Sequence, residues 1–384
     1  MTGFPAGAEV TLAELEDDPH PVLARLRATE PVSWLPVLDG WLVTRHDLAL
    51  RVMRDPATFT VADPRFSTAR VVGPSMLSLD GAAHARHREP FATPFRPAEV
   101  RDRFAGFVAA RANRLIAAFA PAGGVELRAG YAGPLAVAVV AEALGLSDVD
   151  PDTVLSWYAA ISGAVSEVTA GRPAGPAGAA AFGLLRATVE RTIAERRTPS
   201  VLLAAAGRLD LEEVVSNAAV LMFGGIDTTE GMIVNAVLHL LRHPGLLAEV
   251  RADPELLGNV VEESVRVEPA AAVIDRYATK DIELGGAPVR RGDLVTVSIA
   301  GANRDPTVFT DPDRFAPHRP GLRANLAFAQ GPHFCLGAQL ARTETVVAVR
   351  RLLDALPALR LDDARPSRPR GLVFRKPPVL HVRW

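Results

Sequence analysis

Cysteine is nearly absent from this chain of 384 residues, which contains a single one, Cys335. One thiol excludes internal disulfides, and it excludes zinc or iron–sulfur sites built from several cysteines. Long apolar runs are missing too. No run of about eighteen apolar residues occurs, and the segment from Met1 to Glu16 is acidic rather than signal-like. We therefore expect a cytoplasmic protein that does not act at a membrane.

A marked excess of charge of either sign is also missing. The formal net charge is −2, which gives no reason to expect nucleic acid or an anionic membrane as a partner. The apolar content of 48% is sufficient for a large buried core. The sequence has no evident linker and no internal repeat, so we expect residues 1–384 to form a single domain.

The only cysteine lies among residues that form turns. Residues 328–337 read Phe-Ala-Gln-Gly-Pro-His-Phe-Cys-Leu-Gly. Gly331 and Pro332 predict a turn, and the apolar periodicity from Ala338 to Leu356 predicts a helix directly after it. Most lone cysteines are inert buried side chains. Cys335, however, is expected at or just before a helix N-terminus, where the helix dipole and free amide groups favour a thiolate.

The longest predicted helix contains a stretch that does not suit a helix. A capping box formed by Asp210 and Glu213 starts it, and His243–Pro244 ends it. Its middle reads Gly-Gly-Ile-Asp-Thr-Thr over residues 224–229. Each glycine costs about 1 kcal/mol relative to alanine, and a buried carboxylate costs more unless it has partners. Such violations are typical of functional sites, although a tolerated kink is the alternative.

Two basic side chains are predicted to share one helix face. His84 and Arg88 are four residues apart in the segment that follows Leu79. Two cationic donors on one face suit an anionic group such as a carboxylate. A solvated basic face is the alternative explanation of the same pattern.

Other parts of the chain are predicted to form a scaffold. Alternating segments around Asp39–Gly40 indicate a hairpin, and the segment from Phe59 to Leu79 is expected to be an irregular wall of a pocket. Two helices are expected between Arg101 and Leu144. Another helical region, Thr153 to Arg197, is interrupted by a loop at residues 171–178 that is either a surface connection or a lid.

The cysteine stretch resembles the haem-binding loop of the cytochrome P450 family, whose usual pattern is Phe-Gly-x-Gly-x-His-x-Cys-x-Gly. The one departure is Ala329, where the family usually has glycine. The other defined positions match the pattern, namely Phe328, Gly331, His333, Cys335 and Gly337. Further family signatures follow in order from about Leu79 to the end of the chain. The resemblance implies a mainly α fold with small β-sheets and a haem b whose iron is bound by Cys335.

The resemblance also implies roles for residues outside this loop. His84, Arg88 and Arg276 would bind haem propionates, and Asp227 with Thr228 would form the acid–alcohol pair that manages proton delivery. Glu263 and Arg266 would form a buried structural pair, completed by either Arg319 or Arg314. The residues implied to line the substrate pocket are Gly224, Val273, Ile274, Val373 and Phe374.

The implied activity is monooxygenation of a small apolar or aromatic molecule, of the kind met in natural-product tailoring. Nothing near the end of the chain resembles a flavin domain, so we expect a ferredoxin and a ferredoxin reductase to supply electrons. Arg86, Arg342 and Arg350 are expected at the ferredoxin docking face. Peroxide-driven turnover, an atypical oxidation such as coupling or nitration, and a non-catalytic haem sensor are the alternatives.

Overall fold

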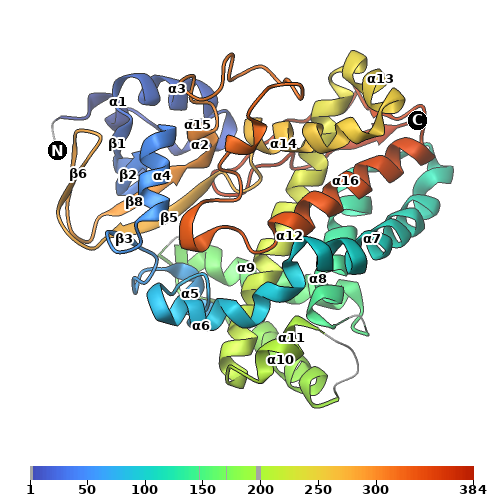
Figure 1. The fold of residues 1–384 in the computed structure, drawn as a ribbon, viewed down its shortest axis with the longest axis horizontal. Helices are drawn as coiled ribbons and strands as arrows, with labels where there is room; N and C mark the ends of the chain where they lie inside the picture. Colours follow the sequence, from blue (N-terminus) through green and yellow to red (C-terminus); the bar gives the residue numbers. More distant parts are fainter. Residues whose placement is uncertain (1–2, 147, 170, 196–199) are drawn as a thin grey trace.

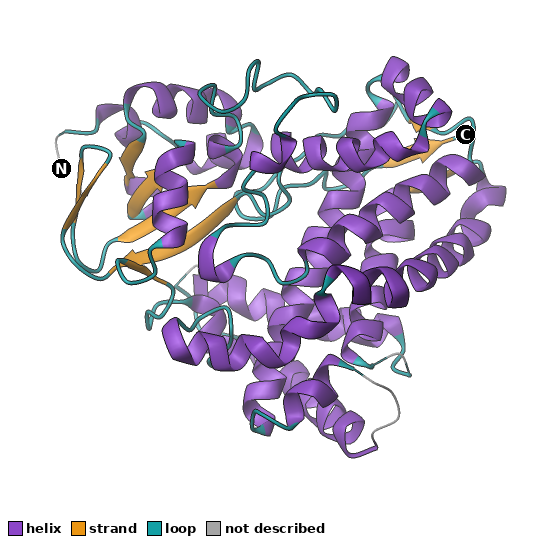
Figure 2. Cartoon of the chain, in the orientation of Figure 1, coloured by secondary structure: helices purple, strands orange, loops and turns teal. Residues whose placement is uncertain are grey.

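The computed structural model describes residues 3–146, 148–169, 171–195 and 200–384. Within these residues the protein is mainly helical, and its largest sheet lies at the opposite end from most of the long helices (Figures 1 and 2). The N-terminus and the C-terminus lie at opposite ends of the long axis (Figure 1). No helix in this part of the chain has both the length and the apolar character needed to cross a membrane.

The helices range from single turns to one of 31 residues. Their bounds are α1 Pro5–Ala8, α2 Leu12–Asp17, α3 His20–Thr29, α4 His46–Arg54, α5 Ser67–Val72, α6 Gly81–Ala92, α7 Pro97–Phe119, α8 Gly133–Leu144, α9 Pro151–Thr169, α10 Pro176–Glu195, α11 Val201–Ala206, α12 Leu211–Leu241, α13 Pro244–Ala252, α14 Leu257–Val267, α15 Ile299–Ala302 and α16 Ala338–Ala355. A π-helical turn, Arg128–Ala132, precedes α8.

The strands are short and form sheets of five, three and two strands in the described residues, in the orders β1-β2-β8-β5-β3, β4-β10-β9 and β6-β7. Among the strand pairs of the described residues, only β2 and β8 run parallel. The bounds of the strands are β1 Val32–Leu35, β2 Gly40–Val43, β3 Phe59–Thr60, β4 Gly124–Glu126, β5 Val273–Ala278, β6 Ile282–Leu284, β7 Ala287–Val289, β8 Leu294–Ser298, β9 Arg360–Leu361 and β10 His381–Arg383.

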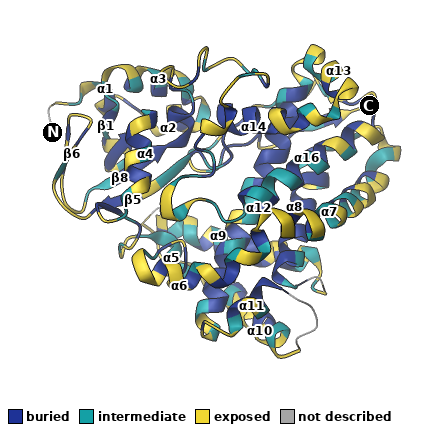
Figure 3. Ribbon diagram, viewed as in Figure 1, coloured by how far each residue is buried: buried dark blue, intermediate teal, exposed yellow. Residues whose placement is uncertain are grey.

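Helix α12 passes through the middle of the molecule, and most of its residues are buried (Figures 1 and 3). It begins at the predicted capping box. The backbone amide of Glu213 donates to the Asp210 carboxylate over 2.9 Å, and the Asp210 amide donates back to Glu213 over 3.1 Å. The two hydrogen bonds satisfy amides that would otherwise lack partners at the first turn. The local sequence therefore fixes where the central helix begins.

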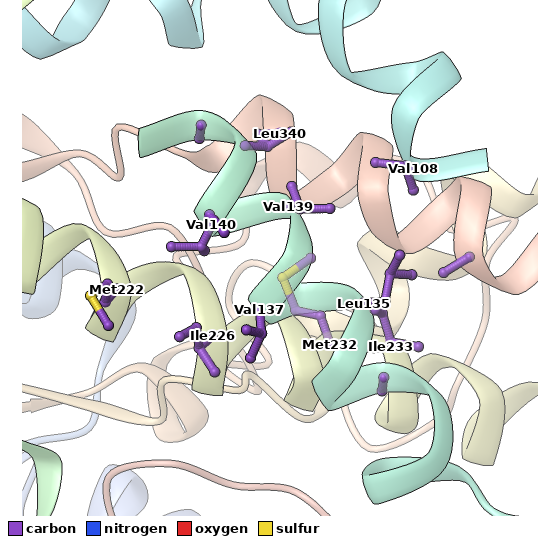
Figure 4. Packing of buried hydrophobic residues seen from close by; sticks show 14 of the residues in the cluster. Val108, Leu135, Val137, Val139, Val140, Met222, Ile226, Met232, Ile233 and Leu340 are labelled. Carbon is purple, nitrogen blue, oxygen red and sulfur yellow. The ribbon is translucent and has the colours of Figure 1, made fainter. Parts of the chain in front are cut away.

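Helices α8 and α16 pack against α12 and form the core beside its kink-prone middle (Figure 4). Val139 and Val140 of α8 face Ile226 and Met232 of α12, and Leu340 of α16 closes the same cluster. Each large aliphatic side chain buried in this way contributes about 1.5–3 kcal/mol to folding. This packing fixes the positions of α8, α12 and α16 relative to one another.

The structure confirms the hairpin, the interrupted helical region and the helix after Cys335. The segment from Phe59 to Leu79 is less irregular than predicted, because it contains β3 and α5. Helix α5 packs on α9, where the Thr169 hydroxyl donates to Ser67 over 2.9 Å. The connection between the two helices predicted from Arg101 to Leu144 contains β4 and the π-helical turn, which the sequence did not indicate. Arg197, the expected end of the interrupted region, lies outside the described residues.

Candidate active site

The loop before α16 holds Cys335 in one fixed place. The Cys335 amide donates to the Phe328 carbonyl over 2.8 Å, which closes the loop. Gly331 has φ +75°, and a Cβ there would lie 2.5 Å from the Met53 carbonyl oxygen, so only glycine fits. Helix α16 begins three residues after the sulfur, at Ala338. The thiol therefore lies at a helix N-terminus, as predicted.

The electrostatic surroundings of this thiol differ from the prediction. Burial raises the pKa of the Cys335 thiol, and the Gly337 amide, Arg88 and Arg342 oppose that rise without cancelling it. The helix terminus alone therefore does not produce a thiolate. A positive centre bonded to the sulfur is what would stabilise the thiolate here, as a metal does for a coordinating thiol.

An apolar cavity lies directly beside Cys335, between α8, α12 and α16. Its volume is about 290 Å³, counted as the space that the centre of a water molecule can occupy. Its walls are mostly aliphatic, including Val139, Val140, Leu221 and Leu340. The site residues predicted from the sequence that line it are Arg88, Gly224, Thr228, Ile274, Phe328, His333, Cys335 and Gly337.

Three residues predicted for the pocket lie outside its lining. Val273 faces a separate small cavity with Leu15 and Leu23. Val373 is 45% exposed, and neither it nor Phe374 lines the large cavity. Both belong to a segment that pairs with residues 270–272, where the Ala272 amide donates to the Val373 carbonyl over 2.8 Å. This pairing fixes the segment behind the cavity wall.

A basic cluster lies at one edge of the cavity. The His84 ring packs on the His333 ring with centroids 4.3 Å apart, and His333 Nε2 lies 2.8 Å from Asp80 Oδ1. Burial alone would raise the pKa of Asp80, but hydrogen bonds from His333 and Thr60 hold it well below its usual range. Within the described part of the chain, His84 Nε2 is buried without a hydrogen-bond partner, and burial together with His333 lowers the pKa of His84 to about 4.

Two arginines complete this cluster. Arg88 lines the cavity and donates to the Phe334 carbonyl over 2.6 Å. Arg276 is buried and donates to the Asp275 carbonyl over 2.7 Å. His84, Arg88 and His333 thus come together from α6 and the cysteine loop, and the charge of Arg276, on β5, interacts with that of Asp80 in the same cluster. The cluster offers several donors to an anionic group at the edge of the cavity.

The predicted acid–alcohol pair is split between two environments. Thr228 lines the cavity, and its hydroxyl donates to the Gly224 carbonyl. Asp227 points away from the cavity, where its Oδ2 accepts a hydrogen bond of 2.6 Å from the Tyr158 hydroxyl and its Oδ1 accepts one from Lys376. Burial and the Asp227 charge raise the pKa of Tyr158, so the phenol stays a hydrogen-bond donor.

Sequence reasoning missed Tyr158, Lys376 and Glu344. Glu344 is buried on α16 and lines the cavity, and its Oε1 has no hydrogen-bond partner among the residues that the structure describes. Burial raises its pKa to about 8. A glutamate on the apolar face of the helix predicted after Cys335 was the available signal, because burial favours the protonated, neutral form of a carboxyl.

The predicted structural pair is fully buried on α14. Arg266 donates from Nε and Nη2 to Glu263 over 2.7 Å each, and neither side chain is exposed. Arg319 Nε lies 3.4 Å from Glu263, whereas Arg314 offers Arg266 only its carbonyl. The sequence left Arg319 and Arg314 as alternatives, and the structure selects Arg319 as the second cation.

The three arginines predicted for electron-donor docking each already have an acidic partner. Arg86 pairs with Glu213, Arg342 pairs with Glu262, and the Arg350 to Glu255 distance is 3.7 Å. Arg342 also lies over the Phe328 ring at 4.1 Å. The positive charge that these residues present to a partner is therefore partly neutralised within the chain.

The residues beside the cavity fit a haem. The Cys335 thiol at the cavity wall would bind the iron, and His84 Nε2, buried and without a hydrogen-bond partner among the described residues, suits an anionic propionate. Among the described residues, a Cβ added at Gly224 or Gly337 would meet no atom within 4 Å beyond its own stretch of backbone, and both glycines line the same cavity as the thiol. Fold and site together define a haem-thiolate protein.

Comparison with known proteins gives the family. The sequence model described as Cytochrome P450 matches residues 186–382. The chain is 33% identical over 395 residues to cytochrome P450 monooxygenase PikC of Streptomyces venezuelae, covering 96% of this chain and 91% of the relative. It is 35% identical over 419 residues to nocardicin C N-oxygenase of Nocardia uniformis subsp. tsuyamanensis, covering 99% and 98%. The protein belongs to the cytochrome P450 family and is a haem-dependent monooxygenase.

Solved structures agree with the fold. The crystal structure of CalO2 superposes with a TM-score of 0.88 at 30% identity, over 98% of this chain and 99% of that one. P450BioI, solved in complex with an acyl carrier protein ligated to hexadec-9Z-enoic acid, superposes with a TM-score of 0.87 at 27% identity, over 97% and 100%. The mainly helical fold with small sheets is therefore that of bacterial P450 enzymes.

Proposed function

We propose that this enzyme uses dioxygen to oxidise a small, largely apolar or aromatic natural product bound in the cavity beside Cys335. The observation that carries the proposal is the aliphatic wall formed by Val139, Val140 and Leu221 on one side of the cavity. An apolar wall binds a substrate by removing its apolar surface from water and leaves few polar contacts to fix it. Because cavity residues come from position 76 to position 344, we treat residues 1–384 as a single catalytic domain.

The chain's own residues have distinct roles in this proposal. Cys335 would bind the iron, while His84, Arg88, Arg276 and His333 would hold the propionates. A haem bound by a thiolate supplies dioxygen activation, because the sulfur pushes electron density to the iron and favours O–O cleavage. The walls position the substrate and exclude water.

Proton delivery is proposed for the acid–alcohol pair. Thr228, at the cavity wall, would hold a water molecule by its hydroxyl. Asp227, one residue earlier on α12, would pass protons from outside the cavity to that water. The two side chains divide the task, because one lines the cavity and the other lies behind it.

Electrons are proposed to come from a ferredoxin that is reduced by a ferredoxin reductase. The docking face would include Arg86, Arg342 and Arg350, whose acidic partners must be displaced or shared when an acidic donor binds. Charge reversal at Arg86 and Arg350, the two more exposed of these arginines, should slow electron transfer. Unchanged transfer rates would place the docking face elsewhere.

Three alternatives to this proposal differ in their support. Peroxide-driven turnover does not need the acid–alcohol pair, so Asp227 and Thr228 count against it. Oxidation at nitrogen is a second candidate, since nocardicin C N-oxygenase is 35% identical over nearly the whole chain. A non-catalytic sensor would bind gases without consuming electrons, and the proposal predicts NADPH consumption instead.

The experiment starts with haem-loaded protein, whose reduced carbonyl form should show the red-displaced absorption of thiolate ligation. Compounds that shift the ferric Soret band are then incubated with NADPH, ferredoxin and reductase under ¹⁸O₂. One labelled oxygen atom in the product supports the proposal. Product formed with hydrogen peroxide alone, and none with the ferredoxin system, would overturn it. Asp227→Asn and Thr228→Ala should each lower product formed per NADPH by about tenfold.

A further inference from the structure

Lys376 has an unusual position for a basic residue of this chain. Only two of the 42 basic side chains are lysines, Lys280 and Lys376. Lys280 is exposed in the turn after β5, whereas Lys376 is 8% exposed. Its Nζ contacts Asp227 Oδ1 and lies 3.1 Å from Glu230 Oε1. One ammonium group therefore joins two carboxylates on the same face of α12, one of them the acid of the proposed proton relay.

The surrounding chain is shaped to admit this ammonium group. Gly231 lies under the lysine stem, and a Cβ there would lie 3.7 Å from Lys376 Cβ and 3.0 Å from Ala270 Cβ. At Gly133, a Cβ would lie 3.2 Å from Glu230 Oε2. Gly133 therefore leaves room for the Glu230 carboxylate, and Gly231 lets α12 pack closely on Ala270 beside the lysine stem.

Asp227, Lys376 and Glu230 form an array of ionic contacts, and this array continues from Glu230 to the surface. Arg128, in the π-helical turn before α8, pairs with Glu230 and donates to the Pro378 carbonyl over 2.9 Å. Its side chain is 38% exposed, so this end of the array reaches solvent. At the other end of the array, the Tyr158 hydroxyl donates a hydrogen bond to Asp227 Oδ2. Both oxygens of Asp227 are thus held on the side away from the cavity.

An ammonium group suits this place better than a guanidinium group would. A lysine presents a compact charge on a flexible four-carbon stem, whereas an arginine prefers one planar two-point contact. Lys376 can therefore shift between Asp227 and Glu230 without losing an ionic partner. Since the site is little exposed, removing the ammonium would leave two carboxylates close together with reduced compensation.

We propose that Lys376 is a positioning residue that controls when Asp227 can turn toward the cavity. With Lys376 on Asp227, the carboxylate is held behind Thr228. With Lys376 shifted to Glu230, Asp227 Oδ1 is free to accept a proton from water on the Arg128 side and pass it to water beside Thr228. Lys376 keeps its charge throughout, and no covalent bond other than those of the moving proton changes. The inference rests on the relay role proposed for Asp227.

The test compares three lysine variants of the haem-loaded enzyme, Lys376→Met, Lys376→Arg and the matched surface control Lys280→Met. A spinach ferredoxin and ferredoxin reductase supply electrons from NADPH, without added substrate, in H₂O and in D₂O. For Lys376→Met we expect the share of NADPH electrons that ends in water to fall about threefold, so that hydrogen peroxide approaches its limit of one per NADPH, and we expect a larger solvent isotope effect, because proton transfer becomes slower. Lys376→Arg should restore part of both values, and Lys280→Met should match the unsubstituted enzyme.

A readout independent of turnover is the urea unfolding equilibrium. The change that Asp227→Asn causes in the unfolding constant should differ by about tenfold between the Lys376→Met and Lys280→Met backgrounds, because residues in contact are coupled. Equal peroxide yields and isotope effects in Lys376→Met and Lys280→Met, with Asp227→Asn still impaired, would overturn the inference and leave the proposed function standing. An Asp227→Asn enzyme with normal proton delivery would instead overturn the proposed function.

Discussion

Arg266 and Glu263 form a two-point ion pair inside the protein, with both nitrogen–oxygen distances at 2.7 Å and neither side chain exposed. Arg266 also donates to the carbonyls of Asn303, Pro312 and Arg314. This single guanidinium therefore connects α14 to the chain segment that leads to the cysteine loop.

Removing one charge of this pair should be costly. In Glu263→Gln, Arg266 keeps its burial but loses its anion, and breaking a buried pair in this way costs about 3–5 kcal/mol. Urea unfolding of the haem-loaded protein measures the cost. Glu255→Gln is the matched control, since the Glu255 side chain is 90% exposed and 3.7 Å from Arg350. An equal unfolding midpoint for both variants would contradict the structural role of the pair.

The two glycines in the middle of α12 should respond in opposite ways to the same substitution. A Cβ at Gly224 would meet no atom within 4 Å, while a Cβ at Gly225 would lie 2.3 Å from Val140 Cγ2. Gly224→Ala should therefore stabilise the helix by about 1 kcal/mol through its higher helix propensity. Gly225→Ala should destabilise by about 1–3 kcal/mol through overpacking against α8.

Urea unfolding of these two variants gives the sign of each change, and the ferric Soret titration gives a second readout. Because Gly224 lines the cavity, Gly224→Ala should also weaken binding of the larger ligands found in the screen. A destabilised Gly224→Ala, or a stabilised Gly225→Ala, would show that α12 is bent differently at this point.

The departure from the family pattern at Ala329 has a local cost. Ala329 has φ +58°, in the left-handed region where a side chain costs about 1–2 kcal/mol. Ala329→Gly removes that cost, but the freer unfolded chain offsets about 0.4–1 kcal/mol of it. We expect a net gain in unfolding free energy of about 0.5–1 kcal/mol. Ala327→Gly, in the same loop but without a positive φ, should lose stability instead.

How much of this protein the sequence predicts depends on how local the signal is. The Asp210–Glu213 capping box is local, so the start of α12 was predictable, and the cysteine loop carries its own glycines and proline. Strand β4 pairs with β10, more than 250 residues away, so residues 124–126 showed no signal of their own. The same applies to Lys376 and Asp227, which are 149 residues apart and meet only in the folded chain.

Buried Glu344 should make stability depend on pH. Its folded pKa of about 8 lies above the ordinary value of 4.5, so the folded protein binds the proton more tightly than the unfolded chain. This contribution is fully present below about pH 4.5 and is lost as pH rises toward 8. It amounts to something on the order of 5 kcal/mol. Glu344→Gln, which cannot ionise, should remove the dependence.

The measurement is the urea midpoint of the haem-loaded protein between pH 5.5 and 8.5, compared among the unsubstituted chain, Glu344→Gln and the control Glu249→Gln, whose side chain is 56% exposed. The unsubstituted chain and the control should lose stability over this range, while Glu344→Gln should lose much less, because its amide stays neutral on both sides of the transition. A Glu344→Gln curve parallel to the control would mean that Glu344 has a cationic or hydrogen-bonding partner in the folded holoenzyme. The carboxyl would then be held ionised beside the haem pocket instead of neutral.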